Sequence, residues 1–331
     1  GLALGLDVEA LLRLHRLVEP VRPAPAVHEP ARVLVDDDDL PCPDALQRRQ
    51  DVLRIKPRAR FAYGRHERFK AADGAMRRLD TGYWSDCPDE EFHLATMEDY
   101  FAHQPGMLVA REVYETVGPF DETLSASEDY EMLVRIACRF DGVRCDGIVF
   151  WQRLHDGDRG PTADRFGAAE REARWIEADR QIFLRFRQSL PLDAYLPRGA
   201  SFPEDVGRRR ALFQRGCIMA RKKLWTEAIA DFSHAAKIDC GPLSPDERSI
   251  VKRATFSKYG CDELIASPSI VRLLSDIGRQ RHLGSDVASA IARGLVWRIR
   301  KAALAGQPVH AGRLLRAVAK LALPLAPTGG L

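Results

Sequence analysis

The chain has 331 residues, enough for about two domains, and its hydrophobic content of 45% is typical of a globular protein. The net charge of +3 is too small to indicate a nucleic-acid partner, and neither a run of about 18 apolar residues nor a secretory signal is visible. Seven scattered cysteines without a CxxC pair favour reduced thiols over disulfides or zinc. We therefore expect a cytoplasmic protein.

Residues 1–30 predict a helical and proline-rich lead-in. GLDVEALLRLHRLVEP has the periodicity of a helix, and VRPAPAVHEPA after it is a proline-rich spacer. The first strand-like segment lies within ARVLVDDDDLPCPDAL at residues 31–46. Its apolar run at residues 33–35 predicts a buried strand, and four consecutive aspartates at residues 36–39 follow where that strand ends.

The acidic run at residues 36–39 allows two interpretations. Four adjacent carboxylates repel one another unless water or a cation screens them. The run is therefore either a solvated turn or a site for a hard cation such as magnesium or manganese. Because strand side chains alternate, Asp36 and Asp38 should point one way and the other two aspartates the opposite way.

The residues after the acidic run predict a helix and a second strand. Pro43 can open a helix over residues 43–55, since proline is favoured at the first helical position. The residues expected to pack this helix on the sheet are Leu46, Val52 and Leu53. RFAYGRHERF at residues 60–69 predicts the strand, and residues 72–74 predict the turn after it.

The next segments predict a short buried strand at residues 106–110 and a helical turn at residues 111–117 that ends at Gly118. An acidic pair follows. Glu128 and Asp129 open the next predicted helix, which Ser125 or Ser127 can cap. The apolar face of this helix consists of Met132, Leu133, Ile136 and Phe140. Acidic residues also favour first turns simply because they complement the helix dipole.

A last strand-like segment, IVFWQRLH at residues 148–155, ends in two cationic side chains, Arg153 and His155. Either can bind phosphate, and either can instead solvate the end of the strand. Residues 167–189 predict a long helix that covers the sheet, and residues 191–207 predict a proline-containing linker.

Three of these segments, in this order and spacing, resemble a family-2 glycosyltransferase of the A-type nucleotide-diphospho-sugar transferase (GT-A) fold. The family's aspartate strand resembles VLVDDDDLPCPDAL, and its acceptor-side block resembles PGMLVAREVYETVGPFDETLSASEDYEMLVRIACRF. Its closing strand resembles IVFWQRLH. The resemblance implies an α/β fold in which residues 31–190 form the C-terminal part of a Rossmann-like transferase sheet. The family's first βαβ unit has no counterpart in residues 1–30, so we expect a fragment or a truncated form.

On the donor side, the resemblance implies that the acidic run and the closing strand bind a nucleotide-sugar. Asp38 is the expected ligand of a divalent metal, Mn²⁺ or Mg²⁺, which would neutralise the leaving diphosphate. Asp36 and Asp37 are expected to contact the nucleotide or its ribose. Arg153 and His155 are expected beside the diphosphate.

On the acceptor side, the resemblance implies that Asp129 is the catalytic base. Inverting transfer needs one carboxylate to take the proton from the attacking hydroxyl. Glu128, Gly106 and Trp84 are expected to contact a glycan or a lipid-linked acceptor. An indole such as that of Trp84 can stack on a sugar, although packing in the core is the alternative.

Residues 208–331 predict a helical domain. LFQRGCIMARKKLWTEAIADFSHAAKID resembles one tetratricopeptide repeat, whose small and aromatic positions are Gly216, Ala228, Phe232 and Ala235. Solenoids need about three repeats for stability, so a helical hairpin within a small bundle is favoured over a peptide-binding repeat.

Residues 281–331 contain eight lysines and arginines against one aspartate, a net charge of +7. Apolar residues alternate with these cations at helical spacing. The segment is therefore expected either to pack on the hairpin as amphipathic helices or to attach peripherally to the anionic inner face of the cell membrane.

The expected function is transfer of a sugar from a nucleotide-sugar donor to an acceptor hydroxyl, with inversion, in cell-surface polysaccharide or glycan synthesis. This expectation comes from the glycosyltransferase resemblance of residues 31–158. The alternative is a non-catalytic adaptor that uses the helical hairpin and the basic tail.

Overall fold

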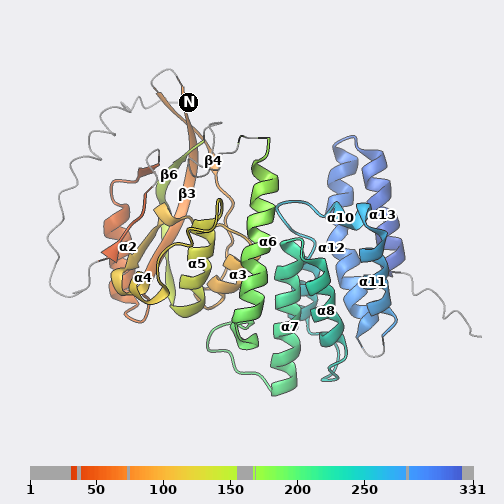
Figure 1. Cartoon of the computed structure of the whole chain (residues 1–331). Helices are drawn as coiled ribbons and strands as arrows, with labels where there is room; N and C mark the ends of the chain where they lie inside the picture. Colours follow the sequence, from red (N-terminus) through yellow and green to blue (C-terminus); the bar gives the residue numbers. More distant parts are fainter. Residues whose placement is uncertain are drawn as a thin grey trace, which may run out of the picture. The chain divides into compact units, whose positions relative to one another are not determined.

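The structure of this protein is a computed structural model that describes residues 31–35, 39–72, 75–154, 167, 169–280 and 283–322. Contacts divide the chain into two compact units (Figure 1). The first, here called the α/β unit, comprises Gly1–Thr96 and Tyr100–Arg171. The second, the helical unit, comprises Met97–Asp99 and Glu172–Leu331. The class expected from the sequence, α/β followed by α-helical, is confirmed at this level.

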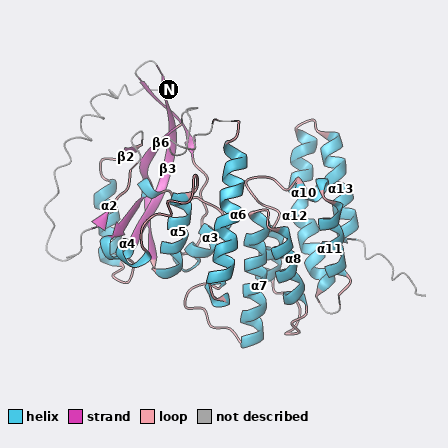
Figure 2. Ribbon diagram, in the orientation of Figure 1, coloured by secondary structure: helices cyan, strands magenta, loops and turns pink. Residues whose placement is uncertain are grey.

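The α/β unit is organised around a mixed sheet of six strands in the described residues (Figure 2). The strands are β1 (Ala31–Arg32), β2 (Leu40–Pro41), β3 (Phe61–Ala72), β4 (Ala75–Thr81), β5 (Met107–Ala110) and β6 (Gly142–Arg153). Their order is β1-β5-β3-β6-β2, and β4 pairs with the later part of β3. Only β3 and β6 run parallel, and the other pairs are antiparallel. The predicted strands at residues 60–69 and 106–110 are β3 and β5.

Two apolar clusters hold the helices of this unit on the sheet. These helices are α2 (Ala45–Ile55), α3 (Phe92–Glu98), α4 (Arg111–Val117) and α5 (Glu128–Arg139). In one cluster Phe61 and Tyr63 of β3 pack with Phe92 and with the apolar face of α5. The other cluster joins β2, α2 and the end of β6, including Phe150. The first contains Met132, Leu133 and Ile136, so the predicted core face of α5 is confirmed.

The strand predicted at residues 33–35 is wrong. Only Ala31–Arg32 form β1, which pairs with Ala110 and Val109 at the edge of the sheet. Residues 33–35 have no strand conformation and are half-buried. Apolar β-branched residues favour a strand only where a neighbouring strand supplies hydrogen bonds, and this edge supplies them for two residues.

The packing face predicted for α2 is confirmed for Val52, which is half-buried and packs against the second cluster, but the fully buried residues of the helix are others. The helix begins at Ala45, two residues after Pro43, and its buried residues are Ala45 and Arg49. Arg49 is 1% exposed and donates to the carbonyl oxygens of Pro105 and Met107 at 3.1 and 2.9 Å. Helical periodicity did not reveal this, because a buried arginine is tolerated only where distant carbonyls accept its hydrogen bonds.

The helical unit contains eight helices in its described residues. They are α6 (Arg171–Ser189), α7 (Glu204–Arg221), α8 (Trp225–Ala236), α9 (Pro245–Arg253), α10 (Glu263–Ala266), α11 (Pro268–Gly278), α12 (Gly284–Leu304) and α13 (Pro308–Ala322). The contacts assign α6 from Glu172 onward to this unit, whereas the sequence placed it with the sheet up to residue 190. None of the described helices is both long and apolar enough to cross a lipid bilayer.

The tetratricopeptide-like hairpin is formed by α7 and α8. Gly216 lies against Phe232, and a Cβ at position 216 would be 2.6 Å from the Phe232 ring and 3.3 Å from the Ala228 carbonyl. Ala228, Phe232 and Ala235 are all buried. The residues predicted to let two helices approach closely therefore do so.

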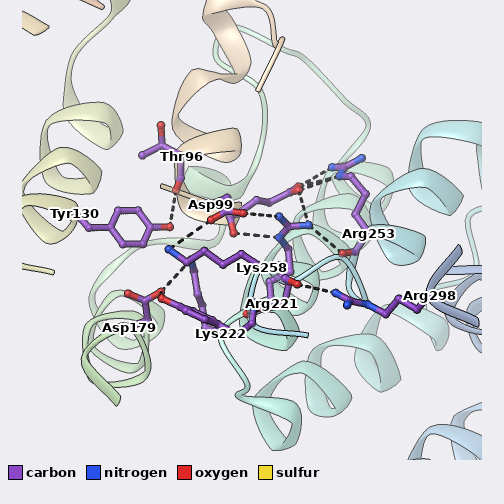
Figure 3. Close-up of polar contacts among 12 residues, drawn as sticks. Thr96, Asp99, Tyr130, Asp179, Arg221, Lys222, Arg253, Lys258 and Arg298 are labelled. Atoms are coloured by element: carbon purple, nitrogen blue, oxygen red, sulfur yellow. Dashed lines mark hydrogen bonds and ion pairs between the residues drawn. The ribbon is translucent and has the colours of Figure 1, made fainter. Parts of the chain in front are cut away.

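A network of buried ions joins α6, α7 and the segment after α9 with Met97–Asp99 inside the helical unit (Figure 3). Lys222 is 2% exposed, and its Nζ lies 3.6 Å from Asp179 Oδ2. Burial lowers the pKa of Lys222 to about 8. Arg221 pairs with Asp99 at 3.4 Å, and Arg253 pairs with Glu98 at 2.7 Å. Such pairs stabilise the unit only while both partners are present.

Candidate functional site

The end of the acidic run is anchored beside the end of the closing strand. β2 pairs antiparallel with β6, so that Leu40 lies opposite Trp151. Asp39, the last aspartate of the run, is 3% exposed, and its Oδ1 accepts a hydrogen bond from the Arg153 backbone N–H at 3.0 Å. Strand β6 stays paired to β3 past this point, since the Leu154 N–H donates to Phe69 O at 2.8 Å. Asp39 is therefore held at the carboxyl end of the two parallel strands.

The predicted donor-side residues fall partly outside the described residues. Asp36, Asp37, Asp38 and His155 lie outside them, and their roles stay predictions. Arg153, the last residue of β6, is exposed. In open α/β sheets, ligands bind outside the carboxyl ends of the strands, which is where Arg153 lies.

The predicted base, Asp129, is held by two hydrogen bonds at the start of α5. Its Oδ1 accepts the backbone N–H of Tyr130 at 2.7 Å, and its Oδ2 accepts the Tyr100 hydroxyl at 2.6 Å. Asp129 is half-buried, whereas its neighbour Glu128 is exposed. A carboxylate at a helix N-terminus is favoured by the helix dipole, and the two donors fix its orientation.

The helix behind Asp129 is fixed by its own side chains. Tyr130 is 1% exposed and donates through its hydroxyl to Thr96 O at 2.7 Å. Arg135 pairs with Glu131 at 2.8 Å and also donates to the carbonyl oxygens of Val117 and Pro119. Arg135 thus holds the start of the loop that precedes the acidic pair.

The cap predicted for α5 is wrong. Ser127 occupies the N-cap position, but it has a φ of 62° and its side chain accepts no capping hydrogen bond. A serine caps a helix from an extended backbone conformation, which a left-handed residue does not have. The Asp129 carboxylate instead accepts a first-turn N–H, that of Tyr130.

A row of aromatic rings connects Asp129 with the β2–β6 junction. The Tyr100 ring lies 4.5 Å from the His103 ring, and the His103 ring lies 4.6 Å from that of His66. His66 in turn stacks on Phe150 at 5.2 Å with an interplanar angle of 26°. Phe150 faces Pro41 across the β2–β6 pair. The predicted base and the anchored end of the acidic run therefore belong to one continuous region.

His66 is neutral at pH 7. Burial, and to a smaller extent the nearby Arg68 guanidinium, lower the pKa of its imidazole to about 4. Gly82 lies over the ring, because a Cβ at that position would overlap His66 Nε2. Sequence analysis missed His66, Tyr100 and His103. The signal for Tyr100 and His103 was the aromatic and histidine content of DYFAHQPG directly before β5, whereas His66 lies inside RFAYGRHERF, which indicated only a strand.

Trp84 and Gly106, the predicted acceptor residues outside α5, are both part of the packing. Trp84 is half-buried between Tyr63, whose ring centroid lies 6.0 Å away, and Phe101 at 5.2 Å. The Arg65 guanidinium lies over its ring at 5.4 Å. Gly106 is buried, and a Cβ there would lie 3.0 Å from the Phe150 ring. Packing accounts for both residues, and their contact with an acceptor stays a prediction.

The described residues alone do not make up a metal site. They contain no group of three or more histidine, cysteine, aspartate or glutamate side chains placed to share an ion. Asp39 uses one carboxylate oxygen to accept the Arg153 N–H. The metal assignment therefore depends on Asp38, which lies outside the described ranges, and it stays a prediction.

No family model matches the chain, and no curated protein matches it.

Proposed function

We propose that this protein is a glycosyltransferase that moves a sugar from a nucleotide-sugar donor to an acceptor hydroxyl, with inversion at the anomeric carbon. The observation that carries the proposal is the junction at which Asp39 accepts the Arg153 N–H. It brings Asp39, the last residue of the acidic run, beside the end of the closing strand, although Asp39 and Arg153 are 114 residues apart in sequence. This is the pairing that the three-motif resemblance requires of a donor site.

The donor would lie at the carboxyl end of β6. Arg153 is exposed there and can offer a charge-assisted hydrogen bond to a phosphate oxygen. Asp36 and Asp37 are proposed to contact the nucleotide, His155 the diphosphate, and Asp38 a Mn²⁺ or Mg²⁺ ion. When bound, that ion would supply positive charge to the leaving diphosphate.

The acceptor hydroxyl would lose its proton to Asp129. General-base catalysis needs a carboxylate whose position is fixed and which stays accessible. Asp129 is half-buried, and hydrogen bonds from Tyr100 and Tyr130 hold its two oxygens. A carboxylate oxygen has more than one lone pair, so an oxygen that already accepts one hydrogen bond can still accept a proton from the acceptor hydroxyl. Glu128, exposed next to it, would contact the acceptor.

The test is a screen for acceptor-dependent nucleotide release with a panel of nucleotide-sugars and Mn²⁺ or Mg²⁺. With the donor that reacts, Asp129→Asn should lower turnover roughly 100-fold or more and leave donor binding unchanged. Glu122→Gln is the matched control, because Glu122 is an exposed carboxylate in the loop before α5. Asp129→Asn with the turnover of the Glu122→Gln control would exclude Asp129 as the base.

A non-catalytic adaptor is the second candidate, and one feature of the helical unit favours it. A pocket of about 430 Å³ opens on the α7–α8 hairpin and is lined by apolar side chains and by Arg208, Arg215, His234 and Lys237. Its cations suit an acidic segment of a partner. If no donor in the screen is consumed and acidic peptides bind the protein, with loss of binding in Lys237→Glu, the adaptor replaces the enzyme.

A further inference from the structure

Exposed apolar side chains of the described residues concentrate on α12 and α13. Of the nine large hydrophobic residues exposed in the described ranges, five lie on these two helices. They are Val296, Trp297, Leu304, Val309 and Leu315, with exposed fractions from 40% for Trp297 to 78% for Leu304. Single exposed hydrophobic residues are ordinary, but a cluster of them marks an interaction surface.

The sequence of α12 places this apolar surface and positive charge on one stripe. Positions i, i+3, i+4, i+7, i+8 and i+11 of a helix share one face. On α12 these positions are Arg293, Val296, Trp297, Arg300, Lys301 and Leu304, and all six are exposed. The opposite side carries Val287, Ile291 and Leu295, which are buried. Packing within the helical unit therefore leaves most of this stripe uncovered, and its described ring contact is that of Trp297 with Phe256.

Helix α13 repeats the arrangement after a short turn at residues 305–307. Leu314, Ala317 and Leu321 are buried, while Val309 and the cations of the helix are exposed. Leu304 and Val309 flank the turn, where Gly306 has a φ of 69°. The tip of the α12–α13 hairpin thus presents two aliphatic side chains with Arg300, Lys301 and Arg313 within about two helical turns of it.

The exposed lysines and arginines of this hairpin lack a carboxylate partner among the described residues, whereas His310 of α13 lies 3.6 Å from Asp262. These exposed lysines and arginines are Arg293, Arg300, Lys301, Arg313, Arg316 and Lys320. The remaining arginine, Arg298, points inward and donates to the carbonyl oxygens of Thr255 and Ser257 at 2.8 and 2.6 Å. The one carboxylate on the two helices, Asp286, lies in the first turn of α12, far along the helix from the tip.

We propose that the α12–α13 hairpin binds the surface of an anionic lipid bilayer, with its tip in the headgroup region. Cations attract the lipid phosphates, and the aliphatic side chains and Trp297 enter the boundary with the acyl chains. The Trp297 ring is held in place, because the Phe256 ring packs edge-on against it with the two ring centroids 5.8 Å apart. A nucleic acid would use the cations but would leave Leu304 and Val309 in water. The proposal is independent of the glycosyltransferase assignment.

The test is flotation of the full chain with phosphatidylcholine vesicles that contain or lack phosphatidylglycerol. Binding should require the anionic lipid and weaken as salt is added, because salt screens exposed charges. Each cation near the surface contributes about fivefold to the partition coefficient. Arg300→Glu/Lys301→Glu should therefore lower binding about 25-fold or more, and Leu304→Ser/Val309→Ser should lower it as well.

Arg248→Glu/Lys252→Glu is the matched control, since it makes the same charge change at two exposed residues of α9 that belong neither to the hairpin nor to the α7–α8 pocket. The control should float like the unmodified chain, and circular dichroism should show equal helix content in all variants. Several outcomes would overturn the proposal. One is binding to neutral vesicles as strong as binding to anionic vesicles, and another is no binding to either kind. A third is a loss of vesicle binding in the control as large as that in Arg300→Glu/Lys301→Glu. Unchanged vesicle binding by Leu304→Ser/Val309→Ser, together with retention of duplex DNA or RNA, would instead identify a site for a polyanion.

Discussion

Acidification should destabilise the α/β unit through His66. The ring is 4% exposed, between Phe150, the edge of His103 and Gly82. Burial lowers the pKa of His66 to about 4 from an ordinary value of 6.5, and Arg68 adds to this while Asp80 opposes it. The folded unit therefore keeps the imidazole neutral at a pH at which the unfolded chain protonates it.

The sign and the size of the effect follow from these two pKa values. Between pH 6.5 and about 4 the unfolded state binds one more proton than the folded state, so the free energy of unfolding falls as the pH is lowered. The difference of about 2.5 pKa units corresponds to about 3 kcal/mol, all of it present above pH 6.5 and lost near pH 4. The rest of the chain titrates too, so the comparison is with His66→Gln, which cannot gain this proton.

Pulse-labelling hydrogen exchange can measure the effect in the α/β unit alone. The protein is equilibrated in urea at several pH values from 4 to 7 and labelled briefly at one common pH. Peptides that cover β3 (Phe61–Ala72) then report the unfolded fraction. As the pH is lowered from 7 to 4, the free energy of unfolding should fall by about 3 kcal/mol more in the unmodified chain than in His66→Gln. Parallel pH profiles for the two proteins would refute the argument that His66 is buried and neutral.

Two further predictions concern the helical unit. Gly216→Ala should lower its free energy of unfolding by about 1–3 kcal/mol, because the new Cβ overlaps the Phe232 ring, whereas Gly312→Ala should raise it by about 0.5–1 kcal/mol because its Cβ meets open space. Urea unfolding followed by circular dichroism measures both, and equal effects would contradict the close approach at Gly216. Because burial lowers the pKa of Lys222 to about 8, the folded unit binds fewer protons than the unfolded chain between pH 8 and 10.5. The free energy of unfolding of the unmodified protein should therefore rise with pH in this range relative to that of Lys222→Met, and identical slopes would refute the lowered pKa of Lys222.

The sequence determined the elements whose signals are local. The α5 helix carries its apolar face at helical spacing, so Met132, Leu133 and Ile136 were predicted in the core and are buried there. The helix α4 ends where predicted, because Gly118 adopts a φ of 86° that other residues rarely take. Motif order placed Asp129 in the first turn of its helix, as observed.

Tertiary structure decided the features that depend on partners far along the chain. The apolar run at residues 33–35 does not indicate whether a neighbouring strand will pair with it, and the sheet edge pairs only Ala31–Arg32. The burial of Arg49 depends on the carbonyl oxygens of Pro105 and Met107. The hydrogen bond from Tyr100 to Asp129 spans 29 residues, and that from Arg153 to Asp39 spans 114. Local periodicity records which face of a segment is apolar, whereas these contacts arise only when the sheet brings separate segments together.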